Sequence, residues 1–223
     1  MVSKIYLIRH GITEGNEKRW YYGGADLPLT EGGKQTLRAL AEKGVYPRLP
    51  EDADLYTTGL VRTEETCEIL FGQREHRVIR NLREMEFGEY ECCTYEELSQ
   101  YPGFEKWAWD ETGDVALPGG ESKNQFADRI KEGLAELIAY HRLRELSHRH
   151  NGKPSVSAVV CHGGVISAVM QQLFPEEKGS MWDWMPSPGF GYVVIFENGD
   201  AAGYEKITEA KEEEAKNEET KTE

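Results

Sequence analysis

The stretch VSAVVCHGGVISAVMQQLF, residues 156–174, decides the fold class. It opens with a short β-branched and apolar run, breaks at His162-Gly163-Gly164, and continues with a segment apolar enough for a buried helix. The stretch KIYLIRHG, residues 4–11, has the same order of strand, histidine and glycine. Continuously apolar strands that lead into helices are typical of a parallel sheet covered on both faces, so both stretches predict an α/β domain.

The chain between these stretches continues the alternation of strands and helices. We expect a helix over 31–43, capped by Thr30 and closed by Gly44, then a strand near 54–58 and a helix over 61–71. Capping-box sequences at 94–97 and 122–125 predict helices that begin near 95 and near 123, the second ending at about 148. The last strand is expected at 191–197. The pattern therefore predicts a three-layer α/β/α sandwich with a mostly parallel central sheet.

Length and charge set the domain organisation and the class of partner. The chain has 223 residues, enough for one domain with a full core, which we expect over 1–208. Its 40 acidic and 26 basic residues give a net charge of −14, which argues against a general partner among nucleic acids or anionic membranes. Residues 209–223 contain seven Glu and three Lys without aromatic or branched aliphatic residues, so we expect a disordered acidic tail there.

Several other classes of protein do not fit the sequence. The chain carries no apolar run long enough to span a membrane and no signal-peptide pattern at its start, so we expect a cytoplasmic protein. The motifs GxxxxGK[ST], HExxH and GxSxG do not occur, and the four cysteines form neither a disulfide framework nor a CxxC metal site. We expect Cys161 to be a buried core residue, because its neighbour His162 points to the other face of an extended strand.

Four basic groups follow three of the predicted strands. Arg9 and His10 follow the first strand, His162 follows the strand at 156–161, and Arg62 begins the helix after the strand at 54–58. In open α/β sheets, ligands bind beyond the carboxyl ends of the strands. Two guanidinium groups bind phosphate oxygens well, and helix amides add donors. Each residue alone could be an ordinary surface or capping residue, but together they predict a phosphate site.

Six motifs in the same order extend this pattern and resemble the histidine phosphatase superfamily, also called phosphoglycerate mutase-like. They are LIRHGITEGN (7–16), DLPLTEGG (26–33), RTEET (62–66), LREMEFG (82–88), PGGES (118–122) and CHGGVI (161–166). The PGGES motif and the absence of the mutase branch's Arg-Arg-Ser run are closer to the phosphatase branch.

The resemblance implies a role for each of the matching residues. His10 corresponds to the nucleophile that becomes phosphohistidine, and Glu84 to the proton donor. The resemblance also implies a phosphate pocket formed by Arg9, Thr13, Asn16, Arg62, His162 and Gly163. Positioned charges stabilise the transferring phosphoryl group in this scheme, so neither a metal nor a cofactor is expected.

Two positions depart from the family pattern, and one segment is inserted. Thr58-Gly59-Leu60 stands where the family has Ser-Pro-Leu, and Cys92 stands where glycine usually follows the acid at 91. Neither change removes a phosphate-binding group, but both put the local backbone and the shape of the pocket in question. The aromatic residues of the inserted segment are Tyr101, Phe104, Trp107 and Trp109. Such residues most often form a local core, but by resemblance this segment covers the active site and contributes to substrate choice.

Together these observations predict a cytoplasmic, metal-independent phosphomonoesterase. It would hydrolyse a small phosphorylated metabolite through a phosphohistidine, as a monomer or homodimer, without nucleic-acid or membrane partners. One alternative is a cofactor-dependent phosphoglycerate mutase. Another is a non-catalytic protein that binds a phosphorylated ligand, although such a protein would have no need of His10 and Glu84 together.

Overall fold

A six-stranded sheet forms the centre of the computed structural model, which describes residues 2–148 and 152–209. The strands are β1 (Val2–Arg9), β3 (Asp54–Thr57), β4 (Arg77–Val78), β6 (Val156–Cys161), β7 (Gly191–Glu197) and β8 (Asp200–Ile207), in the spatial order β4-β3-β6-β1-β7-β8. The pairs β4–β3, β3–β6 and β6–β1 are parallel, whereas β7 is antiparallel to both β1 and β8. The prediction of a mostly parallel sheet is confirmed.

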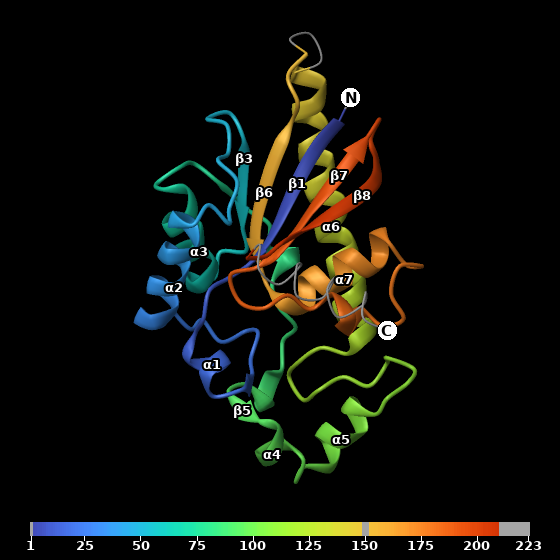
Figure 1. Ribbon diagram of the computed structural model, residues 1–223. Helices are drawn as coiled ribbons and strands as arrows, with labels where there is room; N and C mark the ends of the chain where they lie inside the picture. Colours follow the sequence, from blue (N-terminus) through green and yellow to red (C-terminus); the bar gives the residue numbers. More distant parts are fainter. Residues whose placement is uncertain (1, 149–151, 210–223) are drawn as a thin grey trace, which may run out of the picture.

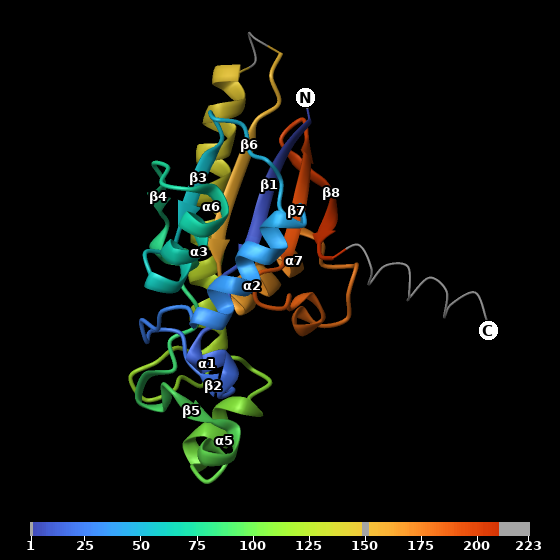
Figure 2. The same ribbon diagram turned by 60° about the vertical axis from the view of Figure 1, so that its left-hand side comes forward.

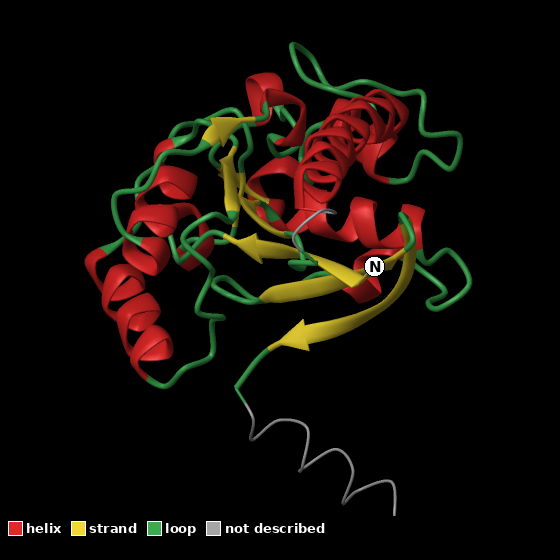
Figure 3. Cartoon of the chain, turned by 90° about the horizontal axis from the view of Figure 1, so that it is seen from above, coloured by secondary structure: helices red, strands yellow, loops and turns green. Residues whose placement is uncertain are grey.

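Helices cover both faces of this sheet (Figure 3). Helices α2 (Glu31–Glu42) and α3 (Val61–Phe71) lie on one face, and α6 (Lys123–His148) and α7 (Gly163–Leu173) lie on the other. Successive residues of β1 point to opposite faces, so Ile8 packs in the cluster of Leu37 while Leu7 packs in that of Leu134 and Val165. The three-layer sandwich is confirmed.

The predicted helix starts agree with the caps that the structure shows. The Thr30 hydroxyl accepts a hydrogen bond from Gly33 N–H at 3.0 Å at the start of α2. Ser122 and Gln125 form the reciprocal bonds of a capping box before α6, at 2.9 and 3.1 Å. Helix α3 has the predicted bounds, and α4 (Tyr95–Leu98) begins where predicted but is only four residues long.

The strand at 191–197 was expected to be the last one, but β8 follows it, so that prediction is wrong. Asn198 and Gly199 both have positive φ, +55° and +94°, and turn the chain tightly from β7 into β8. The sequence pattern also missed short elements, which are β4, α1 (Glu14–Glu17), α5 (Pro102–Ala108), β2 (Trp20–Tyr21), β5 (Cys93–Thr94), η1 (Arg80–Leu82), η2 (Gly88–Tyr90) and η4 (Met181–Trp184).

A small lobe lies beyond the carboxyl ends of the parallel strands (Figures 1 and 2). It contains the β2–β5 pair, α4 and α5, and its centre is formed by the buried rings of Phe104 and Trp107, whereas Tyr101 and Trp109 are exposed. None of the described helices is long and apolar enough to cross a membrane. The predicted tail lies outside the described residues except for Glu209, which pairs with Lys43 at 2.7 Å.

Candidate active site

A cavity of about 330 Å³ opens between the sheet and the small lobe. Its polar floor consists of Arg9, His10, Asn16, Arg62 and Glu84. The other lining residues are largely apolar: Trp20, Tyr21, Tyr22, Met85, Phe87, Trp107, Lys123, Phe126, Ala127, Gly164, Ala168, Met181, Trp182 and Met185. The fold thus brings the strand-end residues at 9, 10 and 62 together with the carboxylate of Glu84.

His10 is buried at the end of β1 with its ring held in one orientation. The Gly11 N–H donates to the Thr66 hydroxyl at 3.0 Å, which fixes the backbone beside the histidine. The Gly11 carbonyl lies 2.7 Å from His10 Nδ1, so this nitrogen carries the proton and Nε2 keeps a lone pair. Burial, and then the charges of Arg62 and Arg9, hold the pKa of His10 well below 6.5. His10 is therefore a neutral imidazole with a free nucleophilic nitrogen.

Arg62 is completely buried at the first turn of α3. Its Nη1 and Nη2 donate to the carbonyls of Ala25 and Gly23 at 2.7 and 2.8 Å, and its Nε donates to His162 Nδ1 at 3.3 Å. A guanidinium has five N–H groups, so two remain for a ligand. Burial lowers the pKa of Arg62, but a guanidinium stays charged in proteins.

Glu91 holds the loop that faces Arg62, and sequence reasoning missed this residue. Its carboxylate accepts hydrogen bonds from the backbone N–H groups of Gly23, Gly24 and Ala25 at 2.9–3.1 Å. It also accepts one from Phe87 N–H at 2.9 Å, just beyond Glu84. One carboxylate therefore ties together two segments that contribute to the site.

Arg9 approaches α7 closely. Its Nη1 donates to the Pro186 carbonyl at 2.6 Å, while its Nε is buried without a hydrogen-bond partner among the described residues. A Cβ atom on Gly163 would lie only 3.0 Å from Arg9 Cζ and 2.4 Å from Met185 Sδ, so a larger residue there would displace one or both of these side chains. Burial lowers the pKa of Arg9, and the nearby Glu84 carboxylate opposes that shift.

The carboxylate of Glu84 is held by backbone groups on two sides. Its Oε2 accepts from Gly164 N–H at 2.9 Å and its Oε1 from Met85 N–H at 3.0 Å. The segment itself is fixed by Arg129 of α6, which donates to the Glu84 carbonyl at 3.1 Å and forms two 2.7 Å bonds with Glu121. Glu84 is thus placed by both α6 and α7.

His162 lies behind the polar floor. It is fully buried, and its ring is edge-on to that of His10 with 5.3 Å between centroids. Its Nδ1 accepts from Arg62, so Nε2 carries the proton and donates to the Thr58 hydroxyl at 2.9 Å. Both ring nitrogens are engaged, and a direct contact of His162 with phosphate stays a prediction.

Thr13 also lies behind the floor. Its hydroxyl bonds to the Tyr22 hydroxyl at 2.7 Å and donates to Asn16 Oδ1 at 3.1 Å. Asn16 itself lines the cavity, and its Oδ1 also accepts from Thr13 N–H at 3.0 Å. Thr13 therefore orients two cavity side chains, and the sequence had not indicated Tyr22 as one of them.

Comparison with known proteins agrees with this geometry. The family model described as histidine phosphatase superfamily (branch 1) matches residues 5–203. The chain belongs to this superfamily. It is 30% identical over 192 residues to the adenosylcobalamin/alpha-ribazole phosphatase of Escherichia coli, covering 83% of this chain and 86% of the relative. It is 29% identical over 181 residues to phosphoglycerate mutase-like protein 4 of Arabidopsis thaliana, covering 79% and 73%.

The same superfamily provides the similar solved structures. A putative alpha-ribazole-5'-P phosphatase from Escherichia coli superposes with a TM-score of 0.73 at 25% identity, covering 90% of this chain and 93% of the other. These relatives support a phosphatase of the histidine phosphatase superfamily.

The two departures from the superfamily pattern have a backbone explanation. Gly59 has φ +77°, a conformation closed to the proline that the family usually has there, so the chain turns differently before α3. Cys92 has φ +60°, the conformation that favours the usual glycine, and its N–H donates to the Tyr21 carbonyl at 2.8 Å. The backbone at 92 is therefore compatible with glycine, and Cys92 does not line the cavity.

Cys161 belongs to the core of this phosphatase rather than to the cavity. It is buried in the cluster of Val159 and Val165, and burial raises the pKa of its thiol. Within residues 2–148 and 152–209, no three His, Cys, Asp or Glu side chains are grouped so as to hold a metal ion.

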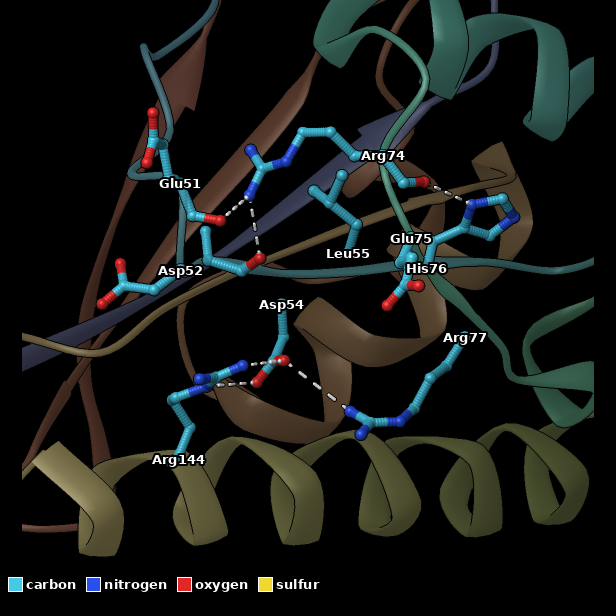
Figure 4. Close-up of a pocket in the computed structure, with 10 residues that line it drawn as sticks. Glu51, Asp52, Asp54, Leu55, Arg74, Glu75, His76, Arg77 and Arg144 are labelled. Carbon is cyan, nitrogen blue, oxygen red and sulfur yellow. Dashed lines mark hydrogen bonds and ion pairs between the residues drawn. The ribbon is translucent and has the colours of Figure 1, made fainter.

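A larger hollow of about 460 Å³ lies at the amino-terminal ends of β3 and β4, whereas the active-site cavity lies beyond the carboxyl ends of the parallel strands (Figure 4). Several of its charged side chains are held by bonds within the hollow. Asp54 accepts from Arg144 Nε at 2.9 Å and lies 3.6 Å from Arg77, while Arg74 donates to the carbonyls of Glu51 and Ala53. This hollow therefore shows a network that stabilises the fold.

Proposed function

We propose that this protein is a metal-independent phosphomonoesterase that hydrolyses a small phosphorylated metabolite through a phosphohistidine at His10. The observation that carries the proposal is a neutral His10 with a free Nε2 on the same cavity floor as Arg9, Arg62 and Glu84. This arrangement combines a nucleophile, two fixed positive charges and a carboxyl group that can transfer a proton.

The first half-reaction transfers the phosphoryl group to the enzyme. Arg9 and Arg62 hold the phosphoryl oxygens, with Asn16 beside them. The lone pair of His10 Nε2 attacks phosphorus in line, and the bond from phosphorus to the ester oxygen breaks. A protonated Glu84 gives its proton to the departing oxygen, so that the product leaves as a neutral alcohol.

The second half-reaction releases phosphate. Glu84, now a carboxylate, takes a proton from water as the water oxygen attacks phosphorus. The bond between phosphorus and Nε2 breaks, and the electron pair returns to His10. The products are inorganic phosphate, a neutral imidazole and a protonated Glu84, as at the start. His162 and Thr13 keep Arg62 and Asn16 in place through both steps.

The nucleophile can be tested by trapping the intermediate. We expect a phosphoprotein that is stable to alkali and labile to acid, with the phosphoryl group located at His10 by mass spectrometry. His10→Gln should release no phosphate from nitrophenyl phosphate or from an alkyl phosphate, whereas the surface variant His76→Gln should remain active. A phosphoryl group found on Cys161, or full activity of His10→Gln, would sink the assignment.

A substrate screen separates the alternatives. The names of relatives make α-ribazole phosphate and 3-phosphoglycerate the first compounds to assay for phosphate release. A mutase would interconvert phosphoglycerates in the presence of bisphosphoglycerate without net release of phosphate. A non-catalytic binding protein would bind phosphorylated ligands tightly without turnover. Activity should survive chelators and be inhibited by tungstate, because Arg9 and Arg62 supply the positive charge.

A further inference from the structure

Most of the larger side chains that line the cavity outside the polar floor are aromatic. We call the side chains Trp20, Phe87, Trp107, Phe126 and Trp182 the aromatic wall. They come from five parts of the chain, including α5 and α6, so the wall is built by the fold and not by one local run. A group attached to the phosphate would find these rings in the same cavity.

Part of this wall is rigid and part is exposed. The rings of Phe87 and Trp107 are buried and pack edge to face with centroids 5.9 Å apart, and Tyr21 packs on Phe87 in the same way at 5.4 Å. Trp182, by contrast, is 60% exposed at the cavity. Preformed rings lose little entropy when a ligand binds, and an apolar ligand would cover the exposed indole.

Lys123 is the one charged side chain among the described lining residues outside the polar floor. Its ammonium group donates to the carbonyls of Ala108 and Asp110 at 3.0 and 2.8 Å and lies 5.6 Å from the ring centroid of Trp107. The Thr112 hydroxyl is the main group that holds the pKa of Asp110 at about 2, and the charge of Lys123 adds a smaller effect in the same direction. Two of the three N–H groups of Lys123 are thus used by the turn at 108–110.

We propose that the alcohol released by this enzyme carries a neutral aryl group and no second acidic group, an inference that rests on the proposed phosphomonoesterase function. A flat ring would bury apolar surface against the aromatic wall. A carboxylate or a second phosphate would lose its water there, and Lys123, the one cation among the described lining residues outside the polar floor, is held at the turn at 108–110 by two of its three N–H groups.

Three phosphate esters that differ in one feature test this inference. Benzyl phosphate has the ring, 4-carboxybenzyl phosphate adds a carboxylate to it, and ethyl phosphate lacks the ring. We expect kcat/KM for benzyl phosphate to exceed both others by about tenfold or more. A kcat/KM for ethyl or 4-carboxybenzyl phosphate equal to or above that for benzyl phosphate would overturn the inference.

Single substitutions connect the preference to the aromatic wall. Trp182→Ala should reduce the advantage of benzyl over ethyl phosphate, as the ratio of their kcat/KM values, several-fold. Trp109→Ala removes an indole that is 76% exposed and outside the cavity, and should leave the preference intact. Lys123→Met should not alter the rejection of 4-carboxybenzyl phosphate, since Lys123 takes no part in it. A preference that Trp182→Ala does not change would contradict the role of the wall.

Binding of non-hydrolysable analogues distinguishes this inference from the proposed function. Calorimetry should show benzylphosphonate binding about tenfold tighter than ethylphosphonate or 4-carboxybenzylphosphonate. If the phosphonates follow this order while no ester is hydrolysed, the proposed function fails and the ligand class stands. If esters are hydrolysed but neither series favours the aryl compound, the ligand class fails alone.

A separate observation concerns Glu91. The peptide between Gly23 and Gly24 lies between two opposite charges, because its N–H donates to Glu91 at 2.9 Å and its carbonyl accepts from Arg62 Nη2 at 2.8 Å. Polarised chains of hydrogen bonds of this kind strengthen one another. A Cβ atom on Gly23 would lie 1.7 Å from the Met85 carbonyl, so this loop also packs against the segment that carries Glu84.

We infer that Glu91 is a positioning residue for Arg62 and acts through the backbone of the loop at 23–25. Glu91→Gln keeps the shape but removes the charge and places an amide N–H₂ among backbone donors. The neighbouring Glu89 is exposed, so Glu89→Gln is a matched control.

The test measures oxyanion binding under conditions where each variant is folded. Glu91→Gln should weaken tungstate inhibition about tenfold and lower kcat/KM for alkyl and nitrophenyl phosphates equally, whereas Glu89→Gln should do neither. A purely structural role would lower the melting temperature and leave the tungstate inhibition constant unchanged, which would overturn the inference. If Glu91→Gln does not fold, Glu91→Asp takes its place, because it keeps the charge but shortens the side chain. The tungstate inhibition constant of that variant then decides whether Glu91 positions Arg62.

Discussion

At the scale of single residues, Glu84 allows the sharpest test of the chemistry. Protonating a poor alkoxide leaving group contributes about 10² to 10⁴ in rate, whereas nitrophenolate departs without a proton. Glu84→Gln keeps an oxygen that can accept from Gly164 N–H but has no proton to give. We expect rapid-quench kinetics to show phosphorylation of His10 slowed by that factor with an alkyl phosphate and only slightly with nitrophenyl phosphate.

Glu86→Gln is the control for that experiment, because Glu86 is exposed and its carboxylate does not line the cavity. It should leave the phosphorylation step unchanged with both substrates. Equal losses for the two substrates in Glu84→Gln would remove Glu84 from the role of proton donor and make another carboxylate the one to test.

Cys92 gives a prediction about stability at the same scale. A residue other than glycine at φ +60° destabilises the folded state by roughly 1–2 kcal/mol. Glycine would remove this strain, but its greater freedom in the unfolded chain would offset about 0.5–1 kcal/mol of the gain. Cys92→Gly should therefore raise the free energy of unfolding by up to about 1 kcal/mol, measured by urea denaturation. Cys92→Ala keeps the strain and should show no such gain; an equal gain in both variants would refute backbone strain as the cause.

At the scale of elements, α3 fixes the nucleophile through Thr66. Its hydroxyl accepts from Gly11 N–H at 3.0 Å and donates to the Arg62 carbonyl at 2.7 Å. Thr66→Val keeps the volume but leaves the buried Gly11 N–H without a partner, which costs about 1–3 kcal/mol. We expect that loss in urea denaturation together with a lower kcat, whereas Thr36→Val on the exposed side of α2 should change neither. An active Thr66→Val variant of normal stability would show that α3 does not hold His10.

The elements that sequence predicted well share a local signal. Helices α2 and α6 have a hydroxyl cap and a buried face, and β6 is a continuous apolar run. Strand β8 has neither, because it lies at the sheet edge and consists mostly of small and charged residues. The Asn198-Gly199 pair is nevertheless typical of a tight β-hairpin turn, so the turn, and not the composition of β8, is the sequence signal for this strand.

The residues of the site also divide into those that the sequence indicates and those that only the packing of distant segments reveals. Arg9, His10 and Arg62 could be predicted because strand ends of a parallel sheet meet at one edge. Asn16 and Glu84 were indicated only by the resemblance of their motifs to the superfamily. Glu91, Tyr22 and Thr66 could not, because their roles depend on which backbone N–H or hydroxyl group is left unpaired once distant loops pack together. Sequence spacing does not determine that packing.

At the scale of the whole molecule, buried histidines make stability depend on pH. Burial is the largest cause that lowers the pKa values of His10, His162 and His141 below 6.5, and for His141 the charges of Glu145 and Asp54 only partly oppose it. His141 is fixed between the hydroxyls of Ser3 and Ser157, each 2.8 Å from a ring nitrogen. In the unfolded chain all three would titrate near 6.5.

Because these pKa values are lowered in the folded protein, the free energy of unfolding decreases as the pH falls. Above pH 6.5 both states are neutral at these positions and their contribution to stability is complete; as the pH falls, the unfolded chain takes up protons that the folded protein does not. Each histidine that stays neutral lowers the free energy of unfolding by up to about 1.4 kcal/mol per pH unit below 6.5. Urea denaturation at pH 7.5, 6.5 and 5.5 should show this loss, and His141→Gln should reduce the slope by one proton. A stability that is flat across this range would mean that the buried rings take up protons in the folded state. An unchanged slope in His141→Gln would mean that His141 itself does so.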